Sequence, residues 1–148
     1  MAPVSGTCGV ERHTVRRAND NDHQGKGDLT MRYMVMHYET EAMENGVTPT
    51  PEQQAAIGEY MKESAMAGVL LGGEGVHPSS SGARLEIADG NVRIIDGPFA
   101  EAKELIAGFA ILEVDSLAEA VEHARKFALI TGVERIDVRR VVEFSDLQ

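Results

Sequence analysis

The residues of this chain that could carry chemistry gather in two short segments, 72–78 and 96–103. Their polar side chains are Glu74 and His77 in the first segment, and Asp96, Glu101 and Lys103 in the second. Each segment lies at the end of a predicted strand beside a predicted hairpin, so we expect the two to face one another. Carboxylate, imidazole and ammonium groups brought together in this way favour acid–base chemistry on a small molecule.

His77 and Asp96 are the predicted catalytic pair. His77 precedes a proline, which holds its backbone extended, and an imidazole with an unperturbed pKa of about 6.5 suits general acid–base work. Asp96 opens an Asp-Gly-Pro-Phe turn that would aim its carboxylate at His77 and fix the imidazole tautomer. A structural interpretation also stands: His77 bonds the loop backbone, Asp96 caps its own turn, and Phe99 anchors that turn in the core.

Other residues are predicted to position a small polar substrate. Glu101 and Lys103 extend from the same side of one segment, although a surface ion pair also explains them. Glu74 and Phe99 flank the pair, and His37 shares a strand face with Tyr33 and Val35. The glycines of 72–75 indicate a bulge or a close approach. The sequence has neither a dinucleotide fingerprint nor a His-Glu-x-x-His motif, so we expect no cofactor and no metal.

Alternation and capping signals predict the elements that carry these residues. Thr50 and Gln53 form a capping box around Pro51, Ser116 and Glu119 form a second, and Asp89-Gly90 marks a hairpin turn. The predicted strands are 32–39, 69–77, 83–88, 92–95, 105–114 and 135–144, and the predicted helices begin at 51 and 117 and end near Gly68 and Gly132.

This order of elements predicts an α+β fold, the ferredoxin-like split βαβ arrangement with an extra β-hairpin. Two helices cover only one face of such a sheet, while residues 105–114 (LIAGFAILEV) read as buried on both sides. An apolar face of that size needs a partner, so we expect a homodimer that forms a dimeric α+β barrel. A monomer with one polar face is the alternative.

Composition narrows the class of protein further. The net charge is −10, which disfavours direct nucleic-acid binding. Residues 1–30 have no hydrophobic period, and we expect a disordered extension there, with residues 31–148 as the domain and Met31 as a candidate for the true initiator. A short regulatory arm is the alternative. Cys8 is the only cysteine, and no apolar run is long enough to span a bilayer. We therefore expect a cytoplasmic protein that does not enter membranes.

Several segments together resemble the YCII-related family, also called DGPF-domain proteins. They are the Asp-Gly-Pro-Phe-Ala-Glu run at 96–101, the opening strand 32–36, the segment 68–78 and the stretches 103–109 and 113–120. The resemblance implies a ferredoxin-like fold and dimerisation. In the family a His–Asp pair has been proposed as catalytic, and Asp96 matches its Asp. The family's His lies in the first helix, where this chain has Gln53 and Gln54, so His77 would have to replace it.

Two function hypotheses follow. The first is a small-molecule-binding domain that performs cofactor-independent proton transfer, of isomerase or lyase type, with His77 and Asp96 as the pair. The second is a non-catalytic regulatory or interaction module, linked to transcription initiation through a protein partner, because family members occur beside or fused to sigma factors. A cavity lined by His77 and Asp96 would favour the first hypothesis.

Overall fold

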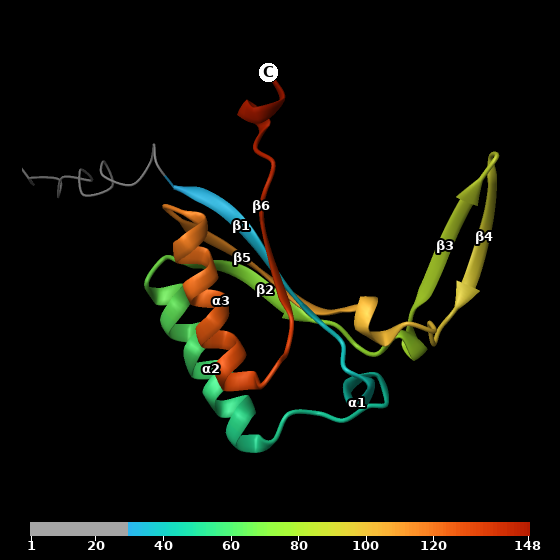
Figure 1. Cartoon of the computed structure of the whole chain (residues 1–148), viewed down its shortest axis with the longest axis horizontal. Coiled ribbons are helices and arrows are strands. Elements are labelled where there is room, and N and C mark those ends of the chain that lie inside the picture. The colour runs from blue at the N-terminus through green and yellow to red at the C-terminus, as the bar shows by residue number, and fades with distance from the viewer. Residues whose placement is uncertain (1–29) are drawn as a thin grey trace, which may run out of the picture.

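Residues 31–38, whose side chains alternate between two faces, form one of the two central strands of a four-stranded antiparallel sheet (Figure 1). The computed structural model describes residues 30–148, and the predicted disordered extension lies outside this part except for Thr30. The described strands are β1 (Met31–Tyr38), β2 (Leu70–Gly75), β3 (Ala83–Ala88), β4 (Asn91–Asp96), β5 (Ile106–Val114) and β6 (Ile136–Arg140). The helices are α1 (Glu41–Glu44), α2 (Pro51–Met66) and α3 (Leu117–Thr131).

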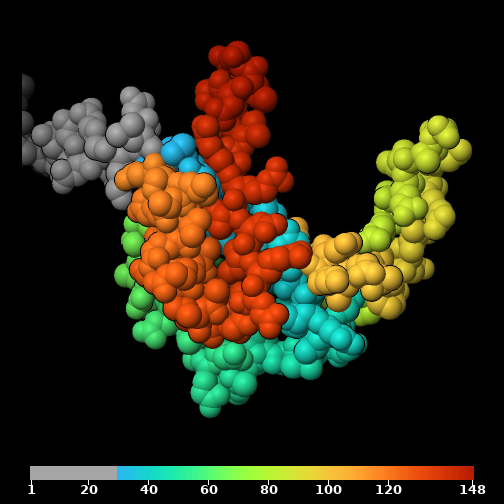
Figure 2. All heavy atoms as spheres, in the orientation of Figure 1, coloured from blue at the N-terminus to red at the C-terminus, as the bar shows by residue number. Residues whose placement is uncertain are grey.

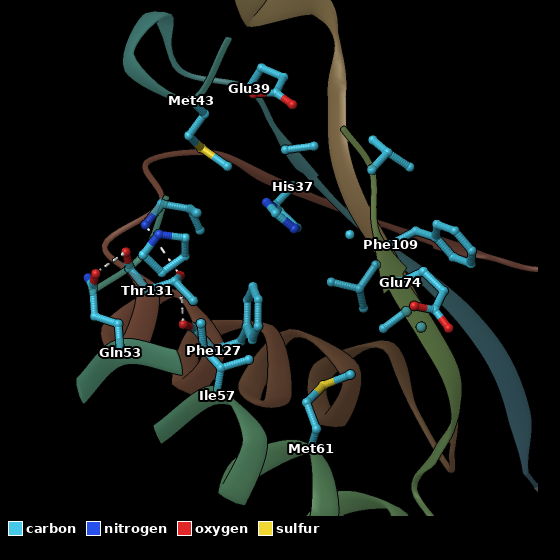
Figure 3. A pocket seen from close by; sticks show the side chains of 18 of the residues that line it. His37, Glu39, Met43, Gln53, Ile57, Met61, Glu74, Phe109, Phe127 and Thr131 are labelled. Carbon is cyan, nitrogen blue, oxygen red and sulfur yellow. Dashed lines mark hydrogen bonds between the residues drawn. The ribbon is translucent and has the colours of Figure 1, made fainter. Parts of the chain in front are cut away.

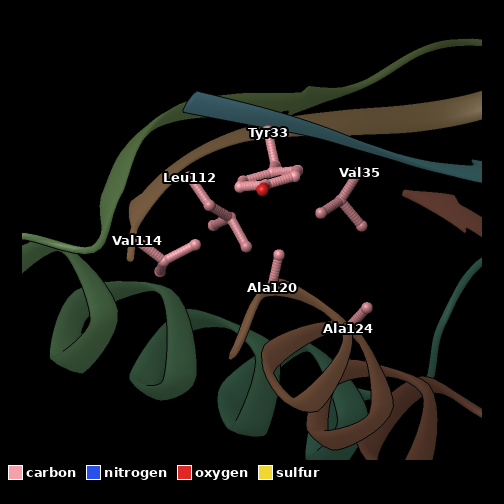
Figure 4. Close-up of a cluster of buried hydrophobic side chains, with 6 residues drawn as sticks. All are labelled: Tyr33, Val35, Leu112, Val114, Ala120 and Ala124. Atoms are coloured by element: carbon pink, nitrogen blue, oxygen red, sulfur yellow. The ribbon is translucent and has the colours of Figure 1, made fainter. Parts of the chain in front are cut away.

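The sheet has the strand order β2-β5-β1-β6, and the β3–β4 hairpin forms a sheet of its own. This is the predicted ferredoxin-like α+β fold with its extra hairpin. Helices α2 and α3 lie side by side on one face of the four-stranded sheet (Figure 1). Between them and the sheet lies the core, whose buried side chains are Tyr33, Val35, Leu112, Val114, Ala120 and Ala124 (Figure 4).

The residues predicted to cap α2 and α3 do form hydrogen bonds at the N-termini of these helices. The Thr50 hydroxyl accepts from the Gln53 N–H at 3.2 Å, and the Gln53 side chain accepts from the Thr50 N–H at 3.0 Å, which completes the capping box. At α3 the Ser116 hydroxyl accepts from the Glu119 N–H at 3.2 Å. There the Glu119 carboxylate accepts instead from the Asp115 N–H, one residue before the cap, at 3.1 Å.

Three features differ from the predicted elements. β2 ends at Gly75 rather than at 77, so His77 lies beyond the strand. The last strand ends at Arg140 rather than at 144, and residues 144–147 form a short 3-10 helix. The four-residue helix α1 was not predicted from the sequence. The Thr40 hydroxyl caps it by accepting from the Met43 N–H at 3.2 Å. This small helix matters for function because it follows β1 directly and helps to form the cavity described below.

The face of the sheet opposite the helices carries an apolar stripe. In the register of β1 and β5, Met34 lies opposite Ile111 and Met36 opposite Phe109. Their neighbours in sequence point toward the helices, because side chains alternate along a strand. All four are partly buried, and Figure 1 shows no described helix on this side.

The β3–β4 hairpin projects from the rest of the molecule (Figures 1 and 2). In its register Leu85 lies opposite Ile94 and Ile87 opposite Val92, so these four side chains share one face. They are 59–72% exposed. The hairpin turn has positive φ at Asp89 and Gly90, as the Asp-Gly signal predicted.

Candidate functional site

A cavity of about 830 Å³ lies between the helix-facing side of the sheet and the two long helices. Ile57 and Met61 reach it from α2, and Phe127 from α3 (Figure 3). Met43 from α1 and the segment 46–49 contribute another wall. No Lys or Arg belongs to the lining, which is mostly apolar. These properties suit a neutral, largely apolar small molecule.

His37 projects from β1 into this cavity (Figure 3). Its ring lies 5.5 Å from the Phe127 ring, tilted by 53°. The Nδ1 atom is buried and has no hydrogen-bond partner among the described residues. Burial lowers the pKa of His37 below its ordinary value, because removal from water disfavours the charged imidazolium. His37 is therefore a neutral imidazole with an unused buried nitrogen.

Glu39 lines the same cavity two residues further along the chain. Its side chain is buried, with 5% of the residue exposed, and Oε2 has no hydrogen-bond partner among residues 30–148. Burial raises the pKa of Glu39, and the nearby charge of Glu44 adds to the effect. Its backbone N–H donates to the Leu105 carbonyl at 2.8 Å, which holds it beside β5.

The other polar side chains deep in the cavity are engaged. The Tyr60 hydroxyl donates to the His123 carbonyl at 2.9 Å and lies 3.3 Å from Nδ1 of the same residue. The Gln53 amide donates to the Thr131 carbonyl at 3.5 Å (Figure 3). Among the residues that the structure describes, His37 and Glu39 are thus the two with buried side-chain atoms left over for a ligand.

All of the predicted site residues except Asp96 line one of two hollows. His37, Glu74 and His77 line the cavity, although His77 and Glu74 are exposed and the Glu74 carboxylate points away from His37 (Figure 3). Phe99, Glu101 and Lys103 line a second hollow of about 730 Å³. Glu39 and Thr40 line both.

Asp96 lies at the end of β4, is exposed, and belongs to the lining of neither hollow. Its side chain and that of His77 make no hydrogen bond to each other. The segment 96–103 instead contacts Ser79, the residue directly after the segment 72–78. The Phe99 N–H donates to the Ser79 hydroxyl at 2.9 Å, and that hydroxyl bonds the Glu44 carboxylate.

The Asp-Gly-Pro-Phe turn packs tightly against this serine. A Cβ atom at residue 97 would overlap the carbonyl oxygen of Ser79, so the glycine is needed for the close approach. The Gly97–Pro98 peptide is cis. The Arg84 guanidinium lies 4.2 Å from the centre of the Phe99 ring. These contacts give the glycine and phenylalanine of the turn a structural part.

The second hollow is more strongly charged than the cavity. The Arg135 guanidinium lies 3.8 Å from the centre of the Tyr38 ring and donates to the Lys103 carbonyl at 2.6 Å. The Tyr38 hydroxyl in turn donates to Asp137 at 2.5 Å. In residues 30–148 no three His, Cys, Asp or Glu side chains are grouped so that they could hold a metal ion.

Sequence reasoning missed Glu39. It follows the first strand, where a glutamate usually marks a solvent-exposed strand end. The available signal was alternation, because residues 33, 35, 37 and 39 fall on one face of an extended chain. That pattern grouped His37 with Tyr33 and Val35, but Glu39, the last residue of the predicted strand 32–39, was not assigned to a face.

A ferredoxin-like α+β domain with an apolar cavity between its sheet and helices is the class of protein that the fold and the site define. Residues 31–145 match the family model of the YCII-related domain, and the chain belongs to that family. It is also similar to an uncharacterized protein of Rhizobium meliloti (strain 1021), 29% identical over 97 residues, which span 64% of this chain and 78% of that protein. The family relationship confirms the resemblance found in the sequence.

Proposed function

We propose that the protein binds a small, largely apolar molecule in the cavity beneath the sheet. The observation that carries this proposal is the combination of an apolar lining with the unpartnered polar atoms of His37 and Glu39. Buried polar atoms in proteins nearly always have hydrogen-bond partners. A ligand with one or two polar groups would supply partners here, and it would be more apolar than the small polar molecule expected from the sequence.

Proton transfer is the chemistry that such a site supports without a cofactor. The pair of His77 and Asp96 stays a prediction, because Asp96 lies outside the cavity lining and a ligand or a second copy would have to connect the two. His37 is better placed to act on a ligand inside the cavity. A cytoplasmic location is part of this proposal and rests on the single cysteine in the sequence.

A thermal-shift series tests the binding proposal directly. The neutral probes tetralin and 1-tetralone and the anionic probe 1-naphthoate are added to the full chain, and the melting temperature is followed with ligand concentration. We expect both neutral probes to raise it, because a ligand that binds the folded state stabilises that state, and 1-naphthoate to raise it least. The absence of any shift with tetralin and 1-tetralone would contradict the proposal.

We further propose that the protein is a homodimer. The uncovered face of the sheet carries Met34, Met36, Phe109 and Ile111, and the hairpin adds Leu85, Ile87, Val92 and Ile94. Exposed apolar surface of this extent is typical of an interaction site. A two-fold axis would let each copy cover both surfaces of the other, and a closed α+β barrel is one arrangement that does so.

The interaction-module hypothesis is the second candidate, and the exposed hairpin face favours it. A module linked to transcription initiation would bind its partner through this face, and substitutions in the cavity would leave that binding unchanged. In a ligand-binding protein, substitutions in the cavity would impair ligand binding, and substitutions on the hairpin face would leave it unchanged.

No described helix has the length and hydrophobicity needed to cross a membrane.

A further inference from the structure

Two cavity-facing positions of one chain segment hold unpartnered titratable groups. His37 and Glu39 are separated by one residue, and both line the cavity, although the register between β1 and β5 shifts between residues 37 and 38. Each has a buried polar atom without a partner among the described residues, Nδ1 in His37 and Oε2 in Glu39. A group that bridged them would face both an imidazole and a carboxyl group.

We infer that Glu39 and His37 act as an acid and a base on a neutral carbonyl compound bound in the cavity. The carboxyl group of Glu39 donates its proton to the carbonyl oxygen, and the imidazole of His37 removes a proton from the adjacent carbon. The C–H bond breaks, a C=C bond forms, and the carbonyl becomes the hydroxyl of an enol. A carboxylate and an imidazolium remain. The imidazolium then returns its proton to the same carbon, or to another carbon, while the enol hydroxyl returns its proton to the Glu39 carboxylate; the carbonyl and both side chains are thereby restored.

The surroundings of the two residues determine which one is the acid. Burial raises the pKa of the Glu39 carboxyl and lowers that of the His37 imidazole. Both effects favour the uncharged pair over the carboxylate and imidazolium pair. The uncharged pair has its transferable proton on Glu39 and its free base on His37, as an enolisation requires.

The charge of the lining determines the substrate class. The cavity contains carboxyl and imidazole groups but neither lysine nor arginine, so nothing offsets the loss of water around an anionic ligand. A carbonyl oxygen accepts a hydrogen bond without carrying a full charge, which matches the donor that Glu39 provides. Met43, Ile57 and Phe127 would hold the hydrocarbon part of such a compound.

Other titratable groups face this pair and belong to its environment. His77 and Glu74 lie at the exposed side of the cavity, and His123 and Tyr60 bond to each other. On the side of the second hollow, Glu44 acts on Glu39 most directly. Glu41, Glu101, Lys103, Glu134 and Arg135 complete that lining.

The inference rests on the proposed binding function, and one experiment separates the two. The full chain is incubated with 1-tetralone in D2O, and exchange of the protons next to the carbonyl is followed by proton NMR. We expect exchange above the buffer rate that increases with protein concentration. Glu39→Gln and His37→Gln should each lower this excess rate about 100-fold, in the range of a general acid–base contribution. Glu59→Gln, an exposed change on α2, should leave it unchanged.

The outcomes are distinct. A shift in melting temperature with 1-tetralone but no excess exchange would overturn the inference and keep the binding proposal. Unchanged exchange in both cavity variants would also overturn it. No melting shift with tetralin or 1-tetralone would overturn both proposals. Should a variant fail to fold, the pH dependence of the unaltered protein decides. We expect a bell-shaped profile, falling in acid, where His37 and Glu39 both carry a proton, and in base, where neither does, whereas a steady rise with pH would contradict the pair.

Discussion

His37 of β1 lies directly across from Gly108 of β5, and its imidazole covers the glycine. A Cβ atom at residue 108 would lie 2.5 Å from Nε2 of His37 and 2.9 Å from the carbonyl oxygen of Glu74. Real Cβ atoms essentially never come so close to other heavy atoms. The orientation of the histidine in the cavity therefore depends on the missing side chain of its neighbour.

Gly108→Ala should displace the His37 ring and destabilise the protein. Overpacking of a well-packed region typically costs about 1–3 kcal/mol, and here both a ring and a backbone carbonyl must move. The free energy of unfolding in urea measures the cost. Gly72→Ala in β2 is the matched control, because nothing lies within 4 Å of a Cβ built there. Equal losses in the two variants would mean that the contact with His37 has no special role.

The stability of the protein should fall in acid because of His37. Its pKa lies below the ordinary value of 6.5 in the folded state, so the unfolded chain binds the proton more readily and acid favours unfolding. This loss should begin as the pH drops below about 6.5 and continue through the lower folded pKa. We expect His37→Gln to remove this part of the decline in urea unfolding experiments across that range. Parallel curves for both proteins would contradict the prediction.

Glu39 should have the opposite effect. Its folded pKa is raised above 4.5, so its contribution to stability is fully present below pH 4.5 and is lost as the pH rises through the folded value. Glu39→Gln removes the group that ionises at higher pH, and the variant should gain stability over the unaltered protein as the pH rises. Melting temperatures at increasing pH measure the difference, with the exposed Glu59→Gln as control. A difference that shrinks with pH would show that the carboxyl group is stabilised as an anion.

Two neighbouring residues of the Asp-Gly-Pro-Phe turn should respond very differently to alanine. Gly97→Ala places a Cβ atom on the carbonyl of Ser79 and should cost about 1–3 kcal/mol or more. Asp96→Ala changes an exposed side chain and should stay within about 0.5 kcal/mol. Urea unfolding of both variants provides the comparison. A large loss of unfolding free energy in Asp96→Ala would contradict this prediction and would indicate that the carboxylate caps the turn.

The hairpin variants test the assembly. Light scattering at micromolar concentration should give about twice the 16.0 kDa of one chain. Ile87→Lys places a charge on the apolar face of the hairpin and should shift the mass toward one chain. Glu86→Lys adds the same side chain on the opposite face and removes only an exposed ion pair with Arg93, which is worth little. A single-chain mass for the unaltered protein would refute the homodimer.

Local signals predicted much of the fold. The capping box at Thr50, the Asp-Gly turn and the alternation of β1 each depend on a few adjacent residues, and each is found as predicted. The site was harder, because it depends on contacts between distant segments. Phe127 and Gly108 surround His37 from two other elements, and alternation along the strand does not show how deeply Glu39 is buried. Asp96 was paired with His77 because both lie near strand ends, because the turn was expected to aim the carboxylate, and because the family resemblance implies a His–Asp pair. Asp96 belongs to the separate hairpin sheet and lies outside the cavity lining.

The proposed dimer makes the order of the projecting β3–β4 hairpin depend on protein concentration. A two-stranded ribbon on its own is only marginally stable in water, and β3 and β4 pair with no other described strand. With its apolar face covered by a second copy, as we propose, mass action would supply the missing stability. The ribbon would then fray in dilute solution while the four-stranded sheet stayed intact, and it would become ordered as the copies meet. The protein would thus carry a segment whose folding and whose assembly are the same event.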